Sequence, residues 1–438
     1  MKQTAQRLFR ETLAALDVRA ALERALARSG SSIHAGNVTV DLRSFDAIVA
    51  IAYGKASFAM AEGLYRVLSP QFSAEGILVV PKAPSHELAG WTTFVGGHPV
   101  PNAASFAAGR AILGRLARCD ERTLIIFLIS GGGSSLVELP LDASVTLSDF
   151  DKLHSALVTC GAPIEEINAI RKHVSATKGG RLAAAAPRSM RLTFAISDVP
   201  KGQDSALASG PTLPDPTTIG DAERVATNYH LLDRFPRSLR AAFENHALGE
   251  TPKAGDPAFA RSHFVLVLGE HELMHAAHHA CEAEGFVCVC DNATDNWQLE
   301  NAADYLLAQL GAHSDANPGR PVAVLADGEL SSPVTGNGTG GRNSAFVLSC
   351  VPRISGKDIV VLSAGTDGID GNSSGAGAVA DGATLSLARS AGLDPGDFLR
   401  RSDAYNFFAR LGDAIVTGPT GNNVRDLRIL LTRPAPRS

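Results

Sequence analysis

The sequence predicts an α/β protein built from two domains. Apolar, strand-like runs alternate with helical patterns along the whole chain, which favours α/β layers with mainly parallel strands. The length of 438 residues is enough for two domains, each with its own core. The stretch ETPKAGDPAF near residue 255 has the composition of a linker. We therefore expect domains over residues 1–255 and 256–438, facing each other across a cleft.

The first series of elements begins with DAIVAIAYGKASFAMAEGLYRVL (46–68), which predicts a buried strand, a Gly-Lys turn and a helix. A strand at GILVVPK (76–82) follows, then a helix that Asn102 can cap, and then a strand that ends at Ser130. Residues 164–186, IEEINAIRKHVSATKGGRLAAAA, predict one long helix, and RLTFAIS (191–197) predicts the next strand.

The second series is expected to begin with the strand HFVLVLGE (263–270) and a helix over residues 271–284. Further strands are predicted in FVCVCDNATD (286–295), PVAVLADGEL (321–330) and DIVVLSAGTDG (358–368), with another helix after the first of them. The chain closes with DAIVTGPTGNNVRDLRILLTR (413–433), and we see no internal repeat or low-complexity tract.

Charge and hydropathy exclude several classes of partner. The formal net charge is -5, and this mild acidity argues against nucleic acid, whose binders usually present a basic face. No segment approaches the roughly 18 to 20 apolar residues that span a bilayer. The first thirty residues have apolar positions at helical spacing but are interrupted by acids, unlike a signal peptide. We therefore expect a cytoplasmic protein, a monomer or homodimer, without a membrane or nucleic-acid partner.

Cysteine and histidine clusters are interpreted as structural. The six cysteines include no C-x-x-C pair, so reduced thiols are expected. In HELMHAAHHACE, histidines share one helix face but lack the H-E-x-x-H arrangement, so a solvated face is favoured over a metal site. A serine hydrolase would need a G-x-S-x-G elbow, which the serine-glycine stretch after residue 129 lacks.

Two glycine-rich loops are candidates for binding an anion. In FLISGGGSSL, a strand runs into three glycines, and glycines let backbone N–H groups approach an anion at a strand end. The alternative is a tight turn without a ligand. The loop is no Walker A motif, because no lysine follows it. TGNGTGGRN (335–343) matches G-x-G-x-x-G but lacks a suitably placed acid, so we interpret it as an anion cradle with Arg342 at its rim, not as an NAD site.

Charged residues follow several of the predicted strands. Lys55 lies where a strand turns into a helix. Its ammonium group can reach a binding site at the ends of the strands, or it can lie in solvent. Asp198 directly follows another strand and suits a divalent metal, a substrate hydroxyl or a helix cap. Acids beside glycine loops, together with a lysine and an arginine, are the components of phosphoryl transfer. Further loop acids of this kind are Asp204, Asp327, Glu329, Asp367 and Asp370.

Ordered motifs along nearly the whole chain resemble the glycerate 2-kinases of the MOFRL type, which have often been labelled hydroxypyruvate reductases. The resemblance rests on YGKAS (53–57), GGHPVP (96–101), LISGGGSSL (128–136), INAIRKHVSATKGGRLA (167–183), ISDV (196–199), ASGPTLPDPTT (208–218), GGRN (340–343), SAGTDGIDG (363–371) and TGPTGNNVRDL (417–427).

The resemblance implies a Rossmann-like three-layer N-terminal domain, a smaller α/β C-terminal (MOFRL) domain, and an active site in the cleft. It also implies phosphorylation of the 2-hydroxyl of D-glycerate by ATP with Mg²⁺. On this hypothesis Lys55, Asp198 and Arg342 are catalytic, and Asp198 and Asp204 hold the metal. The residues expected to bind phosphate or the hydroxy acid are Ser130, Gly131, Gly132, Gly133, Ser134, Arg171, Lys178, Gly340, Gly341 and Asp367.

The chain departs from the family pattern at three places. PKGQD follows ISDV where a Gly-Asp-Asp-like turn is usual, and Ala345 and Ser374 stand where acids are common. These changes concern the metal arrangement and the acceptor more than the reaction class. The rival hypotheses are an NAD(P)H-dependent hydroxypyruvate reductase, and a related kinase or non-catalytic sensor for a longer hydroxy acid.

Overall fold

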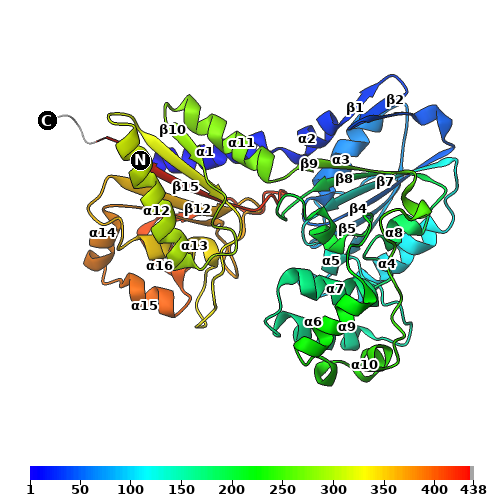
Figure 1. Cartoon of the computed structure of the whole chain (residues 1–438). Coiled ribbons are helices and arrows are strands. Elements are labelled where there is room, and N and C mark those ends of the chain that lie inside the picture. The colour runs from blue at the N-terminus through cyan, green and yellow to red at the C-terminus, as the bar shows by residue number, and fades with distance from the viewer. Residues whose placement is uncertain (435–438) are drawn as a thin grey trace. The chain divides into compact units, whose positions relative to one another are not determined.

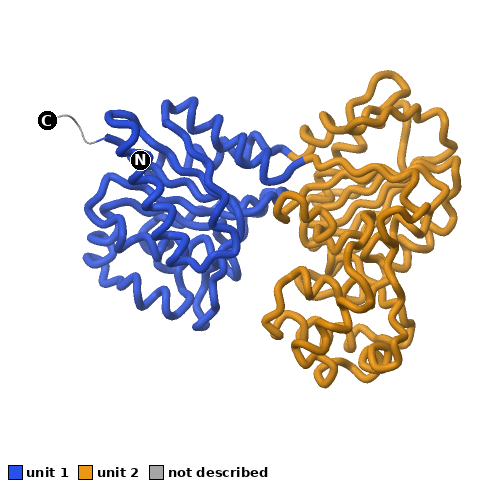
Figure 2. The backbone as a smooth tube through the Cα atoms, viewed as in Figure 1, with its two compact units in different colours: residues 1–17, 268–438 blue, residues 18–267 orange. Residues whose placement is uncertain are grey.

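The computed structural model describes residues 1–434 and divides into two compact units (Figures 1 and 2). Unit 1 comprises residues 1–17 and 268 onward, and unit 2 comprises residues 18–267. The predicted boundary at residue 255 differs from this division in two ways. The chain passes from unit 2 to unit 1 at residue 268, and residues 1–17 belong to unit 1 with the C-terminal part of the chain. Helix α1 (Lys2–Ala15) packs within unit 1 against α11 (Glu270–Ala283) and β12 (Ile359–Gly365), and Lys2 pairs with Asp413 at 2.7 Å. The expected linker near residue 255 lies inside unit 2.

Unit 2 is built on a six-stranded sheet. Its strands lie in the order β6-β5-β4-β7-β8-β9, and the pairings from β6 through β8 are all parallel. HFVLVLGE was expected to open the second domain, but it forms the edge strand β9 here. The strands are β4 (Ala47–Tyr53), β5 (Glu75–Val80), β6 (Trp91–Val95), β7 (Thr123–Ser130), β8 (Met190–Ile196) and β9 (Ser262–Leu268).

Helices cover this sheet because its strands are apolar on both faces. Alternate residues of β4, such as Val49 and Ile51, join a core with Ile112 and Leu116 of α4, whose predicted cap is confirmed: the Ser105 amide donates to Asn102 Oδ1 at 2.9 Å. Unit 2 also contains a small antiparallel sheet, made of β1 (Leu26–Ser29), β2 (Ser32–Ala35) and β3 (Val38–Asp41). The helices are α2 (Val18–Ala25), α3 (Ser57–Leu68), α4 (Ala103–Leu116), α5 (Gly133–Leu136), α6 (Leu147–Val158), α7 (Ile164–Val174), α8 (Arg181–Ala184), α9 (Ile219–Asn228) and α10 (Arg237–Glu244).

The long helix predicted over residues 164–186 is wrong, because the structure breaks it into α7 and α8. At Ser175 the chain is extended and bridges to Pro140, and Gly179 and Gly180 have φ angles of 56° and 80°. Positive φ lies outside the right-handed helical region, so the helix cannot continue through these glycines. The break aims α7 into a helical lobe with α6, α9 and α10, which has a core of its own (Figure 1).

Unit 1 contains a second six-stranded sheet, in the order β10-β11-β15-β12-β13-β14. The expectation of mainly parallel strands is wrong here: β10 and β11 are parallel, and the other pairs are antiparallel. Two of these antiparallel pairs arise because the final strand, β15, inserts between β11 and β12 in the opposite direction. The strands are β10 (Val287–Cys290), β11 (Val322–Asp327), β12 (Ile359–Gly365), β13 (Gly377–Asp381), β14 (Ala414–Ile415) and β15 (Asp426–Thr432).

The helices of unit 1 enclose one large apolar cluster that includes Phe346, Phe407 and Phe408. The predicted helix over 271–284 is confirmed as α11, within one residue at each end. Besides α1, the helices are α11 (Glu270–Ala283), α12 (Leu299–Ala316), α13 (Arg342–Cys350), α14 (Thr384–Ser390), α15 (Pro395–Arg400) and α16 (Ala404–Leu411). Over the 434 described residues, no helix has both the length and the apolar character that crossing a bilayer requires.

Candidate functional site

In unit 2, three loops carrying predicted site residues meet at one edge of the parallel sheet. Lys55 follows β4, Gly131 to Gly133 follow β7, and Asp198 follows β8. These strands are neighbours, with Tyr53 opposite Ile129 and Ser130 opposite Ile196. The chain order reverses between β4 and β7, and ligands of open α/β sheets bind at such a switch point.

The loops after β4 and β7 are locked together by backbone contacts. The Lys55 amide donates to the Gly131 carbonyl at 2.9 Å, and the Ala56 amide donates to Ser130 Oγ at 3.0 Å. Gly54 has a φ of 124°, and a Cβ there would lie 2.1 Å from Ser130 Oγ. Glycine is therefore required at position 54, where the loops after β4 and β7 are in close contact. This contact fixes Lys55 beside the serine-glycine loop.

The serine-glycine loop packs closely against other parts of unit 2. Gly132 has a φ of 79°, and a Cβ on it would approach His98 to 3.0 Å and Lys55 Cγ to 3.3 Å. A Cβ on Gly133 would lie 2.9 Å from the Tyr53 ring. Packing against Tyr53 is therefore enough to explain why position 133 is a glycine, without any ligand, which is what a tight turn requires. At Gly132, the side chains of Lys55 and His98 both lie next to the backbone of the glycine.

The two predicted metal ligands lie on the segment that follows β8. Asp198 is half-buried two residues after the strand, and half-buried Asp204 begins a 3-10 turn (Asp204–Ser209). This turn is tied to the serine-glycine loop, because Ser209 Oγ lies 2.9 Å from Ser134 Oγ. Asp198 and Asp204 therefore belong to the same group of loops as Lys55.

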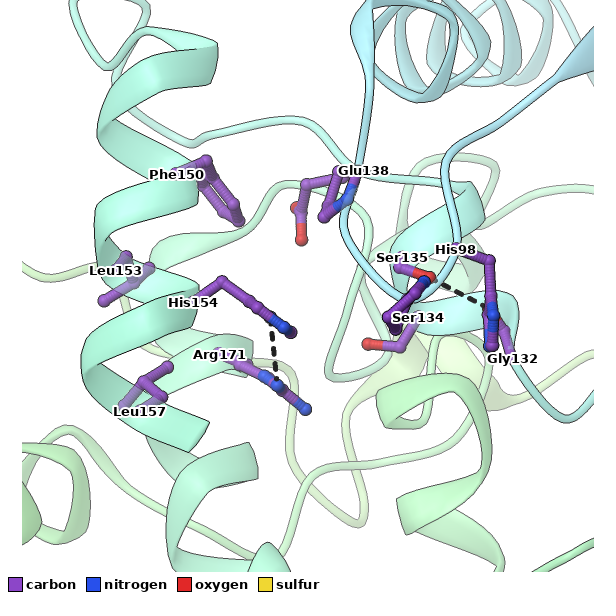
Figure 3. Close-up of a pocket in the computed structure, with 12 residues that line it drawn as sticks. His98, Gly132, Ser134, Ser135, Glu138, Phe150, Leu153, His154, Leu157 and Arg171 are labelled. Carbon is purple, nitrogen blue, oxygen red and sulfur yellow. Dashed lines mark hydrogen bonds between the residues drawn. The ribbon is translucent and has the colours of Figure 1, made fainter. Parts of the chain in front are cut away.

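A cavity of about 220 Å³ opens beside the serine-glycine loop, within unit 2 (Figure 3). One wall consists of that loop and the GGHPVP loop, and the other belongs to α6 and α7. Predicted site residue Arg171 reaches it from α7, and its Nη2 lies 3.4 Å from His154 Nδ1. The lining residues are His98, Pro99, Pro101, Gly132, Ser134, Ser135, Glu138, Phe150, Leu153, His154, Leu157 and Arg171.

Lys178 was expected to bind phosphate or the hydroxy acid, but the structure places it in a buried ion pair. Its ammonium group donates to Glu138 Oε2, and the two side chains are 2% and 3% exposed. Burial lowers the pKa of Lys178, and the charge of Glu138 opposes that effect. Ser175 also donates to Glu138, at the break after α7. We therefore assign Lys178 a structural role.

Arg342 lies in unit 1, at the first turn of α13, between two carboxylates. Its Nη2 is 2.7 Å from Glu329 Oε1, and its Nε is 2.5 Å from Asp426 Oδ2. Burial alone would lower the pKa of Arg342, but Asp426 and Glu329 outweigh it and raise the pKa above its ordinary value. The side chain keeps 35% exposure, so a permanently charged and oriented guanidinium remains accessible.

A second arginine of unit 1, Arg425, forms ion pairs with three acids: Asp327 at the end of β11, Asp295 in the segment after β10, and Glu270 at the start of α11. Its guanidinium lies 3.1 Å from Asp327, 2.5 Å from Asp295 and 3.3 Å from Glu270. Asp327 ends β11 and is 1% exposed, and its Oδ1 has no hydrogen-bond partner within residues 1–434. Burial raises the pKa of Asp327 to about 6, although Arg425 opposes the shift.

The raised pKa of Asp327 predicts that folding stability falls as the pH rises. The folded chain holds this proton up to about pH 6, whereas an unfolded aspartate releases it near pH 4. Between these values the folded state binds more protons, so the free energy of unfolding decreases with increasing pH, by up to about 3 kcal/mol. We expect urea unfolding from pH 4 to 7 to show this loss, and Asp327→Asn to remove it. A difference between variant and wild type that stays constant across the series would contradict the assignment.

The glycine loop before α13 was predicted to cradle an anion at Gly340 and Gly341, but the structure fills that position with Asp370. The Asp370 carboxylate accepts from the amides of Gly341, Asn343 and Ser344 at 3.2, 2.9 and 2.9 Å. The Gly340 amide donates to Asn372 Oδ1 at 2.8 Å. Both predicted phosphate donors are thus used inside the protein.

Three other positions noted in the sequence lie near this loop. Asp367 is half-buried after β12, and its Oδ1 accepts from the Ile369 amide at 2.9 Å. Ala345 is buried within α13, and Ser374 Oγ lies 2.9 Å from the Tyr405 hydroxyl. A carboxylate at position 345 would therefore lie inside the packed face of α13.

Sequence reasoning missed several residues of these clusters. His98 and Arg425 lie within quoted motifs, GGHPVP and TGPTGNNVRDL, so their charged or titratable side chains in glycine-rich loops could have marked them. Glu138, His154 and Asp295 belong to no recognisable motif. Tertiary contacts alone bring them to the cavity and to the Arg425 cluster.

Comparison with known proteins places these clusters in context. Residues 4–244 match a domain of unknown function, DUF4147, and residues 322–426 match the MOFRL family. A D-glycerate 2-kinase of Thermotoga maritima is 34% identical over 89% of this chain and 92% of its own. A putative hydroxypyruvate reductase of Agrobacterium vitis is 37% identical over 87% of this chain and 86% of its own. A crystal structure of glycerate kinase from Thermotoga maritima matches with a TM-score of 0.83 at 31% identity, over 98% of this chain and 99% of its own.

Proposed function

The chain belongs to the glycerate kinase family that carries the DUF4147 and MOFRL domains, and on that premise we propose that it transfers the terminal phosphoryl group of ATP to the 2-hydroxyl of D-glycerate. The observation that carries the proposal is the convergence of Lys55, the serine-glycine loop and Asp198 at one edge of a parallel sheet. The strand order of unit 2 is that of a doubly wound nucleotide-binding sheet, which supports a Rossmann-like description.

Lys55 is the proposed electrostatic catalyst of unit 2. Phosphoryl transfer places negative charge on the transferring oxygens, and a fixed cation aimed at them lowers the barrier. The backbone contact between Lys55 and Gly131 holds this cation beside the loop. We assign phosphate binding to Gly132 and Ser134, which line the cavity, because Ser130 and Gly131 are buried and hold the loop through Ala56 and Lys55.

Asp198 is the proposed Mg²⁺ ligand, with Asp204 as its partner. The donors fit Mg²⁺, which is usually held by one or two carboxylates together with water and substrate phosphates. When bound, the ion would neutralise charge on the phosphate oxygens. Within residues 1–434, no three His, Cys, Asp or Glu side chains are grouped so that they could hold a metal ion by themselves.

Arg342 is the proposed cationic group of unit 1. Glu329 and Asp426 hold its guanidinium in one orientation and keep it charged, while part of it stays exposed to accept an anion. Arg425 directly precedes Asp426, the first residue of β15, and pairs with Asp327, Asp295 and Glu270. We assign this cluster the role of fixing the start of β15, where Asp426 lies.

An assay for the two possible reactions tests the proposal. Purified protein with ATP, Mg²⁺ and D-glycerate is expected to form ADP and phosphoglycerate, and to leave NADH or NADPH absorbance unchanged with hydroxypyruvate. Consumption of NADH or NADPH without any need for ATP would instead support a reductase. A reductase is disfavoured by the loop before α13, whose amides are occupied by Asp370 and Asn372 rather than open to a dinucleotide.

A further inference from the structure

The cavity in unit 2 has two chemically different walls. Figure 3 shows Ser134, Ser135, Gly132 and His98 on one side. On the other side, α6 contributes an apolar surface of Phe150, Leu153 and Leu157, which are 4%, 1% and 1% exposed. Arg171 and His154 point from the helical side into the space between the walls. A ligand here therefore meets polar groups at one end and an arginine at the other.

Arg171 faces this cavity without a carboxylate partner. Its hydrogen bond is to the His154 ring, and within residues 1–434 it makes no ion pair. The nearby acid, Glu138, is committed to Lys178 and Ser175. Burial lowers the pKa of Arg171, and Glu138 offsets only part of this effect. A half-buried guanidinium of this kind is stabilised by an anion that enters the cavity.

The cavity limits what that anion can be. Its volume of about 220 Å³ is below the roughly 300–1,000 Å³ of pockets that enclose drug-sized ligands, which favours a small ligand over a whole nucleotide. The surface of Phe150, Leu153 and Leu157 offers no partner for a second charge, and a desolvated charge there would be costly. The ligand is therefore small, carries one carboxylate, and has a polar end directed to the glycine loop.

We propose that this cavity binds the acceptor of the reaction, a small monocarboxylic hydroxy acid, with its carboxylate on Arg171 and its hydroxyl toward Gly132. His154 is a positioning residue: its Nδ1 accepts from Arg171 and holds the guanidinium toward the cavity. The assignment rests on the proposed kinase function for the identity of the acid. Lys55, whose Cγ is 3.3 Å from a Cβ built on Gly132, then lies at the hydroxyl end.

Binding of D-glycerate without nucleotide tests the role of Arg171. By isothermal titration calorimetry, Arg171→Gln is expected to weaken glycerate binding by roughly 10- to 100-fold, because a charge-assisted pair is lost, and to leave ATP binding unchanged. Lys152→Gln is the matched control, since Lys152 is exposed on the same helix as His154 and lies outside the cavity lining. Arg171→Lys keeps a charge and should lose less affinity. Unchanged glycerate affinity in folded Arg171→Gln, or a loss for ATP instead, would overturn the proposal.

Two further measurements test orientation and ligand class. His154→Leu should raise the KM for glycerate with little change in kcat. His154→Gln, which keeps a hydrogen-bond acceptor for Arg171, should have a KM close to that of the wild type. Tartronate, in which a second carboxylate replaces the hydroxymethyl group of glycerate, should bind at least about tenfold more weakly, since that charge has no partner. Equal effects of the leucine and glutamine variants would remove the positioning role. Tighter binding of tartronate would remove the monocarboxylate assignment.

The outcomes separate this proposal from the function on which it rests. Turnover of glycerate with ATP, combined with an unchanged glycerate KM in Arg171→Gln, would refute the cavity assignment and leave the kinase intact. Arg171-dependent binding of glycerate without any ATP turnover would refute the kinase and leave the acid site intact.

Discussion

Lys55→Met is expected to lower kcat for glycerate phosphorylation by roughly 10²- to 10³-fold, the usual cost of removing one preorganised charge stabiliser. Methionine keeps most of the length of the side chain and the backbone amide that donates to Gly131, so the contact between the two loops should survive. Steady-state kinetics with saturating ATP and glycerate would measure the loss, and thermal melting would confirm that the variant is folded.

Lys82→Met is the control for this substitution, because Lys82 is an exposed lysine just after β5. It should behave like the wild type. A kcat for Lys55→Met within a few-fold of the wild-type value would show that Lys55 is a surface lysine, as the alternative interpretation of its position holds.

Lys178→Met is expected to reduce the free energy of unfolding by about 3–5 kcal/mol, because it leaves Glu138 buried and uncompensated. Both side chains are nearly inaccessible to solvent, so screening by water does not diminish the effect. Urea unfolding of the purified variant would measure it.

The double variant Lys178→Met with Glu138→Gln is the control. It removes both charges together, so it should recover most of the lost stability. If Lys178→Met unfolds like the wild type and instead loses affinity for glycerate, the structural role of Lys178 is wrong, and the expectation from the sequence that it binds the hydroxy acid is favoured.

The sequence was sufficient to predict which loops meet in unit 2. Lys55, the serine-glycine loop and Asp198 each follow a strand of an α/β pattern, and parallel strands end at the same edge of their sheet. Local rules also predicted the Asn102 cap, because a cap depends on residues that are close in sequence.

The features that could not be predicted depend on contacts between distant segments. The packing of α1 in unit 1, the insertion of β15 between β11 and β12, and the pairing of Lys178 with Glu138 all join residues far apart in the chain. The glycines before α13 show the same limit. Their spacing suggests an anion site, and there is indeed an anion, but it is the protein's own Asp370.

The position of the phosphate in the product tests the kinase assignment most directly. Phosphorus NMR of the product formed from ATP and D-glycerate should show a new phosphate resonance split by a single proton, that of the C2 methine. A resonance split by the two methylene protons of C3, or no phosphate transferred to glycerate at all, would contradict the proposed 2-kinase.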